Sequence, residues 1–217
     1  MRALRYSAPP SSWTTWPPNL STGPPVPPHL TTPTRDEAWE LMTSITPSLQ
    51  LRRHMRSVEM AMRAYARRFG EDEERWGLLG VIHDWDYESG PTLDLHPMRG
   101  IAMLREKGWP EDILDDIASH ALYLDVPRDT AIRKTLHAVD EMCGFIIACA
   151  LVKPDKSLSA VEPAGVRKKM KDKAFARAVH REELVNGAEL LGIPFDEHVE
   201  IVRDALKPIA EELGLNP

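Results

Sequence analysis

Apolar residues recur at helical spacing along the chain from Thr34 onward, and no stretch shows the Val, Ile and Thr alternation of a β-strand. The clearest run places an apolar side chain at i, i+4, i+7, i+11, i+14 and i+18, namely Leu51, Met55, Val58, Met62, Tyr65 and Phe69. It stops at Gly70, the residue type that most often ends a helix in the left-handed conformation. The pattern therefore predicts an all-α domain.

Capping residues and prolines indicate where the helices begin and end. Thr34 and Glu37 form a capping box that opens a short helix ending before Pro47. Pro97 and Pro110 each occupy a position typical of a first helical residue. Further helices are expected through residues 76–83, over 132–150 with a stop at Pro154, and over about 164–174, 178–191 and 196–213.

The first 33 residues differ in composition from the rest of the chain. They hold nine of the 19 prolines and no acidic residue. Proline cannot continue a helix or occupy a central strand, so we expect residues 1–33 to be a disordered tail. Arg2 and Arg5 supply less positive charge than a typical transit peptide carries, which favours a tail or a mis-assigned start codon over a targeting segment. Residues 34–217 have the length of a single domain.

The composition argues against two classes of partner. The net charge of −6 is unlike that of a protein that coats extended nucleic acid. No apolar run approaches the roughly 20 residues that span a membrane, so no membrane association is expected. Cys143 and Cys149 stand six apart in an apolar segment, a spacing that favours buried free thiols in a reducing compartment. We therefore expect a cytoplasmic protein.

Histidines and aspartates approach the apolar faces of five successive helical segments. His83 and Asp84 follow an apolar run in the stretch VIHDWDYE, and His120 continues the Ile113 and Ile117 series. A buried carboxylate is costly unless it is paired or bound to a metal ion, and imidazole with carboxylate suits Zn, Fe or Mn. The full set of candidate metal ligands is His54, His83, Asp84, His96, His120 and Asp140.

The order of these residues resembles the HD-domain superfamily of metal-dependent phosphohydrolases. The resemblance covers roughly Thr34 to Asp155, and the segment HPMRGIAMLREKGWPEDILDDIASHA is similar to the HDIG-type subset. The sequence HDWDYE departs from the His-Asp-Ile-Gly-Lys signature of that subset and lacks its lysine. The resemblance implies an HD-type helical bundle with a metal core at about 48–153 and a basic helical extension over 154–217.

The same resemblance implies two sites for divalent metal ions. The first would use His54, His83, Asp84 and Asp140, and the second would add His96 and His120 with Asp84 as the bridge. Two cations about 3.5–4 Å apart can activate water and polarise a phosphoryl oxygen. Mn, Fe, Co, Ni, Mg and Zn are all compatible with these ligands, and a single-metal variant with only the first site stays open.

Two further groups of residues are candidates for catalysis and substrate binding. Asp86 could orient a ligand histidine or carry a proton beside the catalytic Asp84, or it could simply begin a loop. Residues 153–181 carry nine basic and three acidic side chains, which makes this segment +6 and the remainder −12. We expect its lysines to bind substrate phosphates, with a solvated helical face as the alternative. The candidates are Lys153, Lys168, Lys169 and Lys173.

These expectations favour a phosphohydrolase that acts on a small phosphorylated, nucleotide-like substrate by attack of metal-activated hydroxide on phosphorus. Two alternatives remain at the level of sequence. One is an HD-type module that binds metal or nucleotide without turnover, and the other is a helical interaction domain with incidental histidines. The sequence leaves open whether the protein is a monomer or a homodimer.

Overall fold

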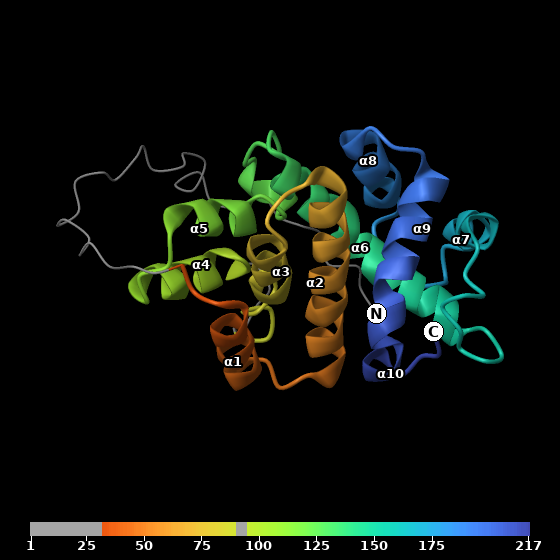
Figure 1. Cartoon of the computed structure of the whole chain (residues 1–217), viewed down its shortest axis with the longest axis horizontal. Coiled ribbons are helices and arrows are strands. Elements are labelled where there is room, and N and C mark those ends of the chain that lie inside the picture. Colours follow the sequence, from red (N-terminus) through yellow and green to blue (C-terminus); the bar gives the residue numbers. More distant parts are fainter. Residues whose placement is uncertain (1–31, 90–94) are drawn as a thin grey trace. The chain divides into compact units, whose positions relative to one another are not determined.

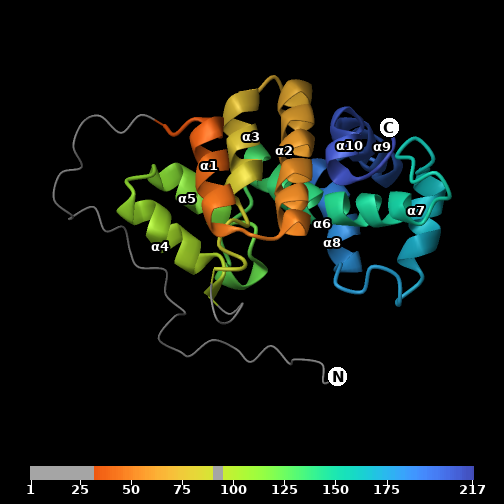
Figure 2. The same ribbon diagram turned by 90° about the horizontal axis from the view of Figure 1, so that it is seen from below.

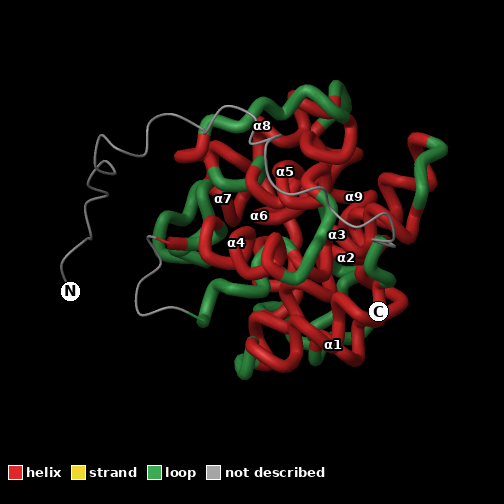
Figure 3. Tube along the Cα trace, turned by 90° about the vertical axis from the view of Figure 1, so that its left-hand side faces the viewer, coloured by secondary structure: helices red, strands yellow, loops and turns green. Residues whose placement is uncertain are grey.

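Helices make up the regular structure in the computed structural model, which describes residues 32–89 and 95–217. Within those ranges there is no strand, only an isolated bridge between Ser157 and Asn216 (Figure 3). The all-α prediction is thus confirmed for the described part of the chain. The expectation of a disordered tail falls on residues that lie, up to residue 31, outside the described ranges.

The first part of the described chain contributes five helices and the second part contributes the long helix α6 with the helices that cover it (Figure 1). In chain order they are α1 (Arg35–Ile45), α2 (Leu49–Phe69), α3 (Glu73–Ile82), α4 (Met98–Glu106), α5 (Glu111–Ala118), α6 (Ala131–Leu151), α7 (Pro163–Met170), α8 (Arg181–Leu191), α9 (Phe195–Leu206) and α10 (Ala210–Leu213). Short 3₁₀ turns, Leu122–Leu124 and Lys207–Ile209, lie before α6 and after α9.

Helices α1, α3 and α2 lie side by side, with α3 in the middle (Figure 2). The α2–α3 pair is unusually close because Gly80 faces the α2 backbone. A Cβ atom on Gly80 would lie 2.6 Å from Cα of Glu59, which leaves no space for a side chain. Gly70 takes φ of +72° and ends α2 as expected, and α3 begins three residues later at Glu73. This packing brings the C-terminal end of α3 beside the middle of α2.

Helix α6 packs against α2, α8 and α9 in the interior of the domain (Figure 1). A buried polar chain joins three of these helices. The hydroxyl of Tyr65 on α2 lies 2.6 Å from Nδ1 of His198 on α9, and Nε2 of His198 lies 3.0 Å from the carbonyl oxygen of Ala138 on α6. Because an unpaired buried polar group is costly, these contacts fix α6 relative to α2.

Helix α5 is tied to its neighbours by one buried carboxylate. Asp116 accepts from Nη2 of Arg75 on α3 at 2.5 Å and from Nε of Arg133 on α6 at 2.8 Å. Asp116 is 6% exposed, so both contacts are shielded from water. Breaking one partner of such a pair leaves an uncompensated buried charge. The pairing therefore holds the residues that follow α5 close to both α3 and α6.

Most of the expected helix starts and ends are confirmed, with three corrections. Pro97 and Pro110 are the capping residues before α4 and α5 rather than the first helical residues. The expected helix over 196–213 is interrupted at Pro208, which has no N–H for the helical hydrogen bond. It continues as a 3₁₀ turn and then α10.

The third correction concerns the segment between α7 and α8, where helices over 164–174 and 178–191 were expected. Helix α7 ends at Met170 because the Asp172 side chain accepts from the backbone N–H groups of Ala174 and Phe175. Arg181 then donates to the carbonyl oxygen of Val179 at 2.7 Å, and α8 begins only at Arg181. Side-chain contacts thus replace the helical hydrogen bonds through this segment.

Two further expectations concern cysteines and membranes. Cys143 and Cys149 on α6 are free and buried, as predicted. Burial raises the pKa of the Cys149 thiol to about 11. Among the described residues, no helix is both long and apolar enough to cross a bilayer.

Candidate metal centre

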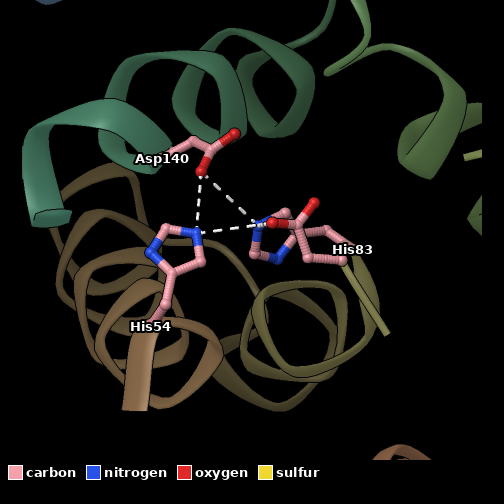
Figure 4. Close-up of side chains that lie close together, drawn as sticks. His54, His83 and Asp140 are labelled. Carbon is pink, nitrogen blue, oxygen red and sulfur yellow. Dashed lines mark hydrogen bonds and ion pairs between the residues drawn. The ribbon is translucent and has the colours of Figure 1, made fainter. Parts of the chain in front are cut away.

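Four of the predicted ligands converge where α2, α3 and α6 meet. His54 comes from the N-terminal third of α2, His83 directly follows α3, and Asp140 comes from the middle of α6. Figure 4 shows the side chains of His54, His83 and Asp140 pointing toward one another from these three elements. Asp84, which follows His83 in the chain, completes this first group of four residues. This is the set of four that the resemblance stated above implies for a first metal site.

The first group of ligand atoms is tightly spaced. Nε2 of His54 lies 3.0 Å from Oδ1 of Asp140 and 3.6 Å from Oδ2 of Asp84. Nε2 of His83 lies 3.5 Å from the same Asp140 oxygen and 3.6 Å from the same Asp84 oxygen. Four ligand atoms from four residues therefore surround one point.

A second group forms on the other oxygen of Asp84. Oδ1 of Asp84 lies 3.1 Å from Nε2 of His96 and 3.3 Å from Nε2 of His120. The two imidazole nitrogens are themselves 3.1 Å apart. Asp84 thus presents one carboxylate oxygen to each group, which is the arrangement expected of a bridging ligand.

The distances in both groups fit ligands around a cation. Ligands bound about 2.1 Å from one ion are about 3.0 Å apart at right angles and about 3.4 Å apart at the tetrahedral angle. His83 provides an independent observation, because its Nε2 is buried and has no hydrogen-bond partner among the described residues. A buried polar atom of this kind is rare without an unseen partner, and a metal ion would supply one. Each of the two groups of residues could therefore hold a metal ion.

Contacts at Nδ1 orient three of the four histidines. Nδ1 lies 2.9 Å from the carbonyl oxygen of Gly80 in His83 and 2.5 Å from that of Ile117 in His120. In His96 it lies 2.6 Å from Oδ1 of Asp86. A histidine that donates from Nδ1 to an oxygen keeps its Nε2 lone pair for a metal, which is how ligand histidines are usually held.

Asp86 serves as the orienting residue for His96. Its second oxygen, Oδ2, accepts from the backbone N–H of Gly100 at 2.7 Å, and its side chain is 1% exposed. With both oxygens engaged and almost no access to solvent, Asp86 is not placed to exchange a proton with substrate. Gly100 is required for this contact, since a Cβ there would lie 2.6 Å from Cγ of Asp86. Of the roles considered from the sequence, the contacts of Asp86 therefore favour orienting a ligand histidine over carrying a proton.

The charges of the centre stabilise one another. Burial opposes ionisation of Asp84, but His83, His120 and His96 hold its pKa well below the usual value. Burial similarly opposes the charge on His96, whereas Asp84 and Asp86 raise its pKa to about 10. Because a ligand histidine must be unprotonated, a cation bound between these atoms would displace such protons.

His83 and Asp140 show the same balance in the first group. Burial lowers the pKa of His83, yet Asp84 and Asp140 raise it to about 9. Burial raises the pKa of Asp140, but the hydrogen bond with His54 and the nearby charge of His83 lower it far below the usual value. The two carboxylates of the first group are therefore ionised and are stabilised by positive charge beside them.

His120 reaches the centre by a different route from the one expected. The sequence predicted it on the helix that carries Ile113 and Ile117, but α5 ends at Ala118 and His120 lies in the turn beyond. The turn still directs its side chain inward, because its backbone N–H donates to the carbonyl oxygen of Ile117 at 3.3 Å. The inward orientation was right, and the helical position was wrong.

The structure does not bring the candidate lysines to the metal ligands. Lys153, Lys168 and Lys169 line a separate cavity of about 360 Å³ between the C-terminal end of α6 and α7. Asp140 and Leu151 are eleven residues apart on α6, which corresponds to about 16 Å of helix axis. Lys153 lies beyond that end, and Lys173 is exposed in the turns after α7. A small substrate at the metal ligands would not reach this cavity.

Two features near the centre were not predicted from the sequence. Glu141, His180 and Glu183 form a third group of possible ligands, in which His180 is largely exposed. Arg128, in the loop before α6, carries two buried nitrogens without a hydrogen-bond partner among the described residues. No motif marks either feature, because both depend on how the loop and α8 pack against α6.

Comparison with known proteins identifies no relative, since no family model, no curated protein and no solved structure matches the chain.

Proposed function

We propose that this chain is a metal-dependent phosphohydrolase with two divalent metal ions at the centre described above. The observation that carries the proposal is the position of Asp84, whose Oδ2 faces His54 and His83 and whose Oδ1 faces His96 and His120. One carboxylate that serves two sets of ligands is the arrangement of a bridged pair of ions. The resemblance of the sequence to the HD-domain superfamily, stated above, supports the same reaction class.

The charge of the ligand set suits an anionic substrate. The six residues contribute two carboxylates, Asp84 and Asp140, and four imidazoles. Two divalent ions on this set leave an excess of about two positive charges, which would attract a phosphoryl group. When bound, such ions lower the pKa of water and polarise a phosphoryl oxygen. A ligand set with more carboxylates would cancel this excess.

The chain's own residues then have separate tasks. Asp84 holds the two positions at a fixed separation, and the histidines fill the remaining positions without adding negative charge. Asp86 and the carbonyl oxygens of Gly80 and Ile117 fix the directions of the imidazoles. Such orienting partners preserve both metal affinity and geometry.

We infer a small phosphorylated substrate, such as a nucleotide-like monoester or diester. The free thiols of Cys143 and Cys149 support a reducing compartment, and we place the protein in the cytoplasm on that basis. The alternative function is a module that binds metal and a phosphorylated ligand without turnover. It would show binding of metal and phosphate with no hydrolysis by any metal form.

The test is a panel of phosphomonoester and phosphodiester substrates, assayed with metal-free protein and after addition of each divalent metal. We expect hydrolysis that depends on metal and is lost by a factor of about 10³ or more in Asp84→Asn. Asp36→Asn is the matched control, since the Asp36 side chain is 88% exposed on α1. Activity that is unchanged in Asp84→Asn, or absent with every metal and substrate, would contradict the proposal.

A further inference from the structure

Arg128 is a cation whose buried nitrogens have no partner in the described part of the chain. It lies in the loop between the 3₁₀ turn Leu122–Leu124 and α6. Its Nε and Nη2 atoms are buried and donate to no hydrogen-bond partner within the described residues, although the carboxylates of Glu183 and Asp125 are near enough to act on its charge. Burial lowers the pKa of its guanidinium, while Glu183 and Asp125 raise it.

Other part-buried arginines around the centre are paired. Arg133, five residues further on, donates from Nε to Asp116 at 2.8 Å. Arg75 has one unpartnered nitrogen, but its Nη2 donates to the same carboxylate at 2.5 Å. Buried charges in folded proteins are normally paired in this way, and an unpaired one calls for a partner that is absent from the chain itself.

The surroundings place Arg128 beside the metal centre. His137 lies one helical turn before Asp140 on α6 and is buried. Burial and the charges of Arg128 and His120 lower the pKa of His137 to about 4, while Asp140 raises it. Burial and Asp140 raise the pKa of Glu183 on α8, while His180, Arg128 and His120 lower it. Arg128 is thus a neighbour of residues that also border the metal ligands, unlike the lysines at the far end of α6.

The two unpartnered atoms define the chemistry of the missing ligand. Nε and Nη2 form one side of the guanidinium plane, and two parallel N–H groups on that side match two oxygens of a phosphate. We propose that Arg128 binds the phosphoryl oxygens of the substrate beside the metal centre, an inference that rests on the proposed function. The lysines of residues 153–173 are then not needed to hold the phosphate.

Inorganic phosphate is the probe, and its affinity is measured by calorimetry on the full chain, metal-free and metal-loaded. In Arg128→Gln we expect the dissociation constant to rise by about tenfold to a hundredfold in the metal-loaded protein, as for loss of a bidentate charge-assisted contact. The dissociation constant of Arg128→Lys should lie between those of the wild type and Arg128→Gln, because lysine keeps the positive charge but lacks the two parallel N–H groups of the guanidinium. Arg177→Gln removes an exposed arginine and should bind phosphate as the wild type does.

Thermal stability gives a second readout that a merely structural arginine would not produce. Without phosphate, Arg128→Leu should melt at or above the wild-type temperature, because it removes an unpaired buried charge. Added phosphate should raise the melting temperature of the wild type more than that of this variant. A structural arginine would instead give a lower melting temperature and the same response to phosphate.

Metal content and hydrolysis measured on the same preparations separate the two proposals. If the wild type binds metal and hydrolyses substrate while Arg128→Gln binds phosphate as tightly as Arg177→Gln, the Arg128 inference is overturned and the proposed function stands. If the wild type takes up no metal and hydrolyses nothing, the proposed function fails. In that case an Arg128-dependent phosphate affinity in the metal-free protein would still support an anion site here, and its absence would overturn it.

Discussion

The Nε2 atoms of His96 and His120 face each other at 3.1 Å, and each lies within 3.3 Å of Oδ1 of Asp84. The Nδ1 atom of each ring already contacts another oxygen, Asp86 Oδ1 for His96 and the Ile117 carbonyl for His120. Two imidazole nitrogens and one carboxylate oxygen at these distances are stabilised by a positive charge between them, either a proton, as the raised pKa of His96 indicates, or a bound metal ion. This relationship is the basis for the second metal position and for the first two predictions below.

Gly100→Ala should weaken the second metal position selectively. A Cβ on Gly100 would lie 2.6 Å from Cγ of Asp86 and 2.7 Å from the indole nitrogen of Trp85, so Asp86 must shift away from His96. Loss of an orienting partner typically lowers metal affinity by about 10- to 100-fold. The measurement is the dissociation constant of the weaker metal equivalent by calorimetry.

Gly165→Ala on α7 is the matched control, because nothing lies within 4 Å of a Cβ built there. It should leave both metal affinities unchanged. Equal metal affinities in the Gly100→Ala and Gly165→Ala proteins would show that the Asp86 contact does not position His96.

Asp86→Asn should reproduce the metal defect by a direct route. The asparagine keeps the shape of the side chain but loses the charge that holds the Nδ1 proton of His96, so the affinity for one metal equivalent should fall by about tenfold or more. Activity should fall with metal occupancy and return at high metal concentration. A variant that stays inactive with both positions filled would instead assign Asp86 a role in the chemical step.

Gly80→Ala should destabilise the fold rather than the site alone. The added methyl group would meet backbone atoms of Glu59 at 2.6 Å and 2.7 Å, and backbone cannot move aside as a flexible side chain can. Overpacking of this kind costs about 1–3 kcal/mol, whereas an unhindered Gly→Ala change in a helix gains up to about 1 kcal/mol. Urea unfolding should therefore rank Gly165→Ala above wild type and Gly80→Ala below it. A Gly80→Ala protein as stable as the wild type would disprove the close α2–α3 contact.

Lysine variants test whether the basic segment binds the substrate at the metal centre. Lys169→Met should leave KM for a small phosphoester unchanged, since its cavity lies at the C-terminal end of α6, away from Asp140. Arg128→Gln, by contrast, should raise KM. A tenfold rise in KM for Lys169→Met at low ionic strength would restore the sequence-based expectation that these lysines hold substrate phosphates.

The sequence predicted those features that depend on local pattern. Periodicity located α2 and α6, Gly70 located the end of α2, and the capping box at Thr34 opened α1 as expected. The six metal-ligand candidates came from residue order and from the resemblance, and the structure brings all six together. Local pattern sufficed because most of these residues sit on, or next to, regular helices.

The features that were missed depend on contacts between distant segments. The lysines were assigned to the substrate from charge alone, yet the length of α6 separates them from Asp140. Arg128 was overlooked because its isolation follows from the fold around it, not from its neighbours in sequence. Gly80 and Gly100 looked ordinary until the close approach of Glu59 and Asp86 was visible.

The stoichiometry of metal binding tests the central claim most directly. Metal-free protein is titrated with a divalent metal in equilibrium dialysis, and bound metal is counted per chain. We predict about two equivalents for the wild type and about one for His120→Ala, because His120 belongs only to the second group. Asp36→Asn, which removes the charge of an exposed carboxylate outside all three groups of possible ligands, should keep about two. A single equivalent in the wild type, or an unchanged count in His120→Ala, would contradict a two-metal centre bridged by Asp84.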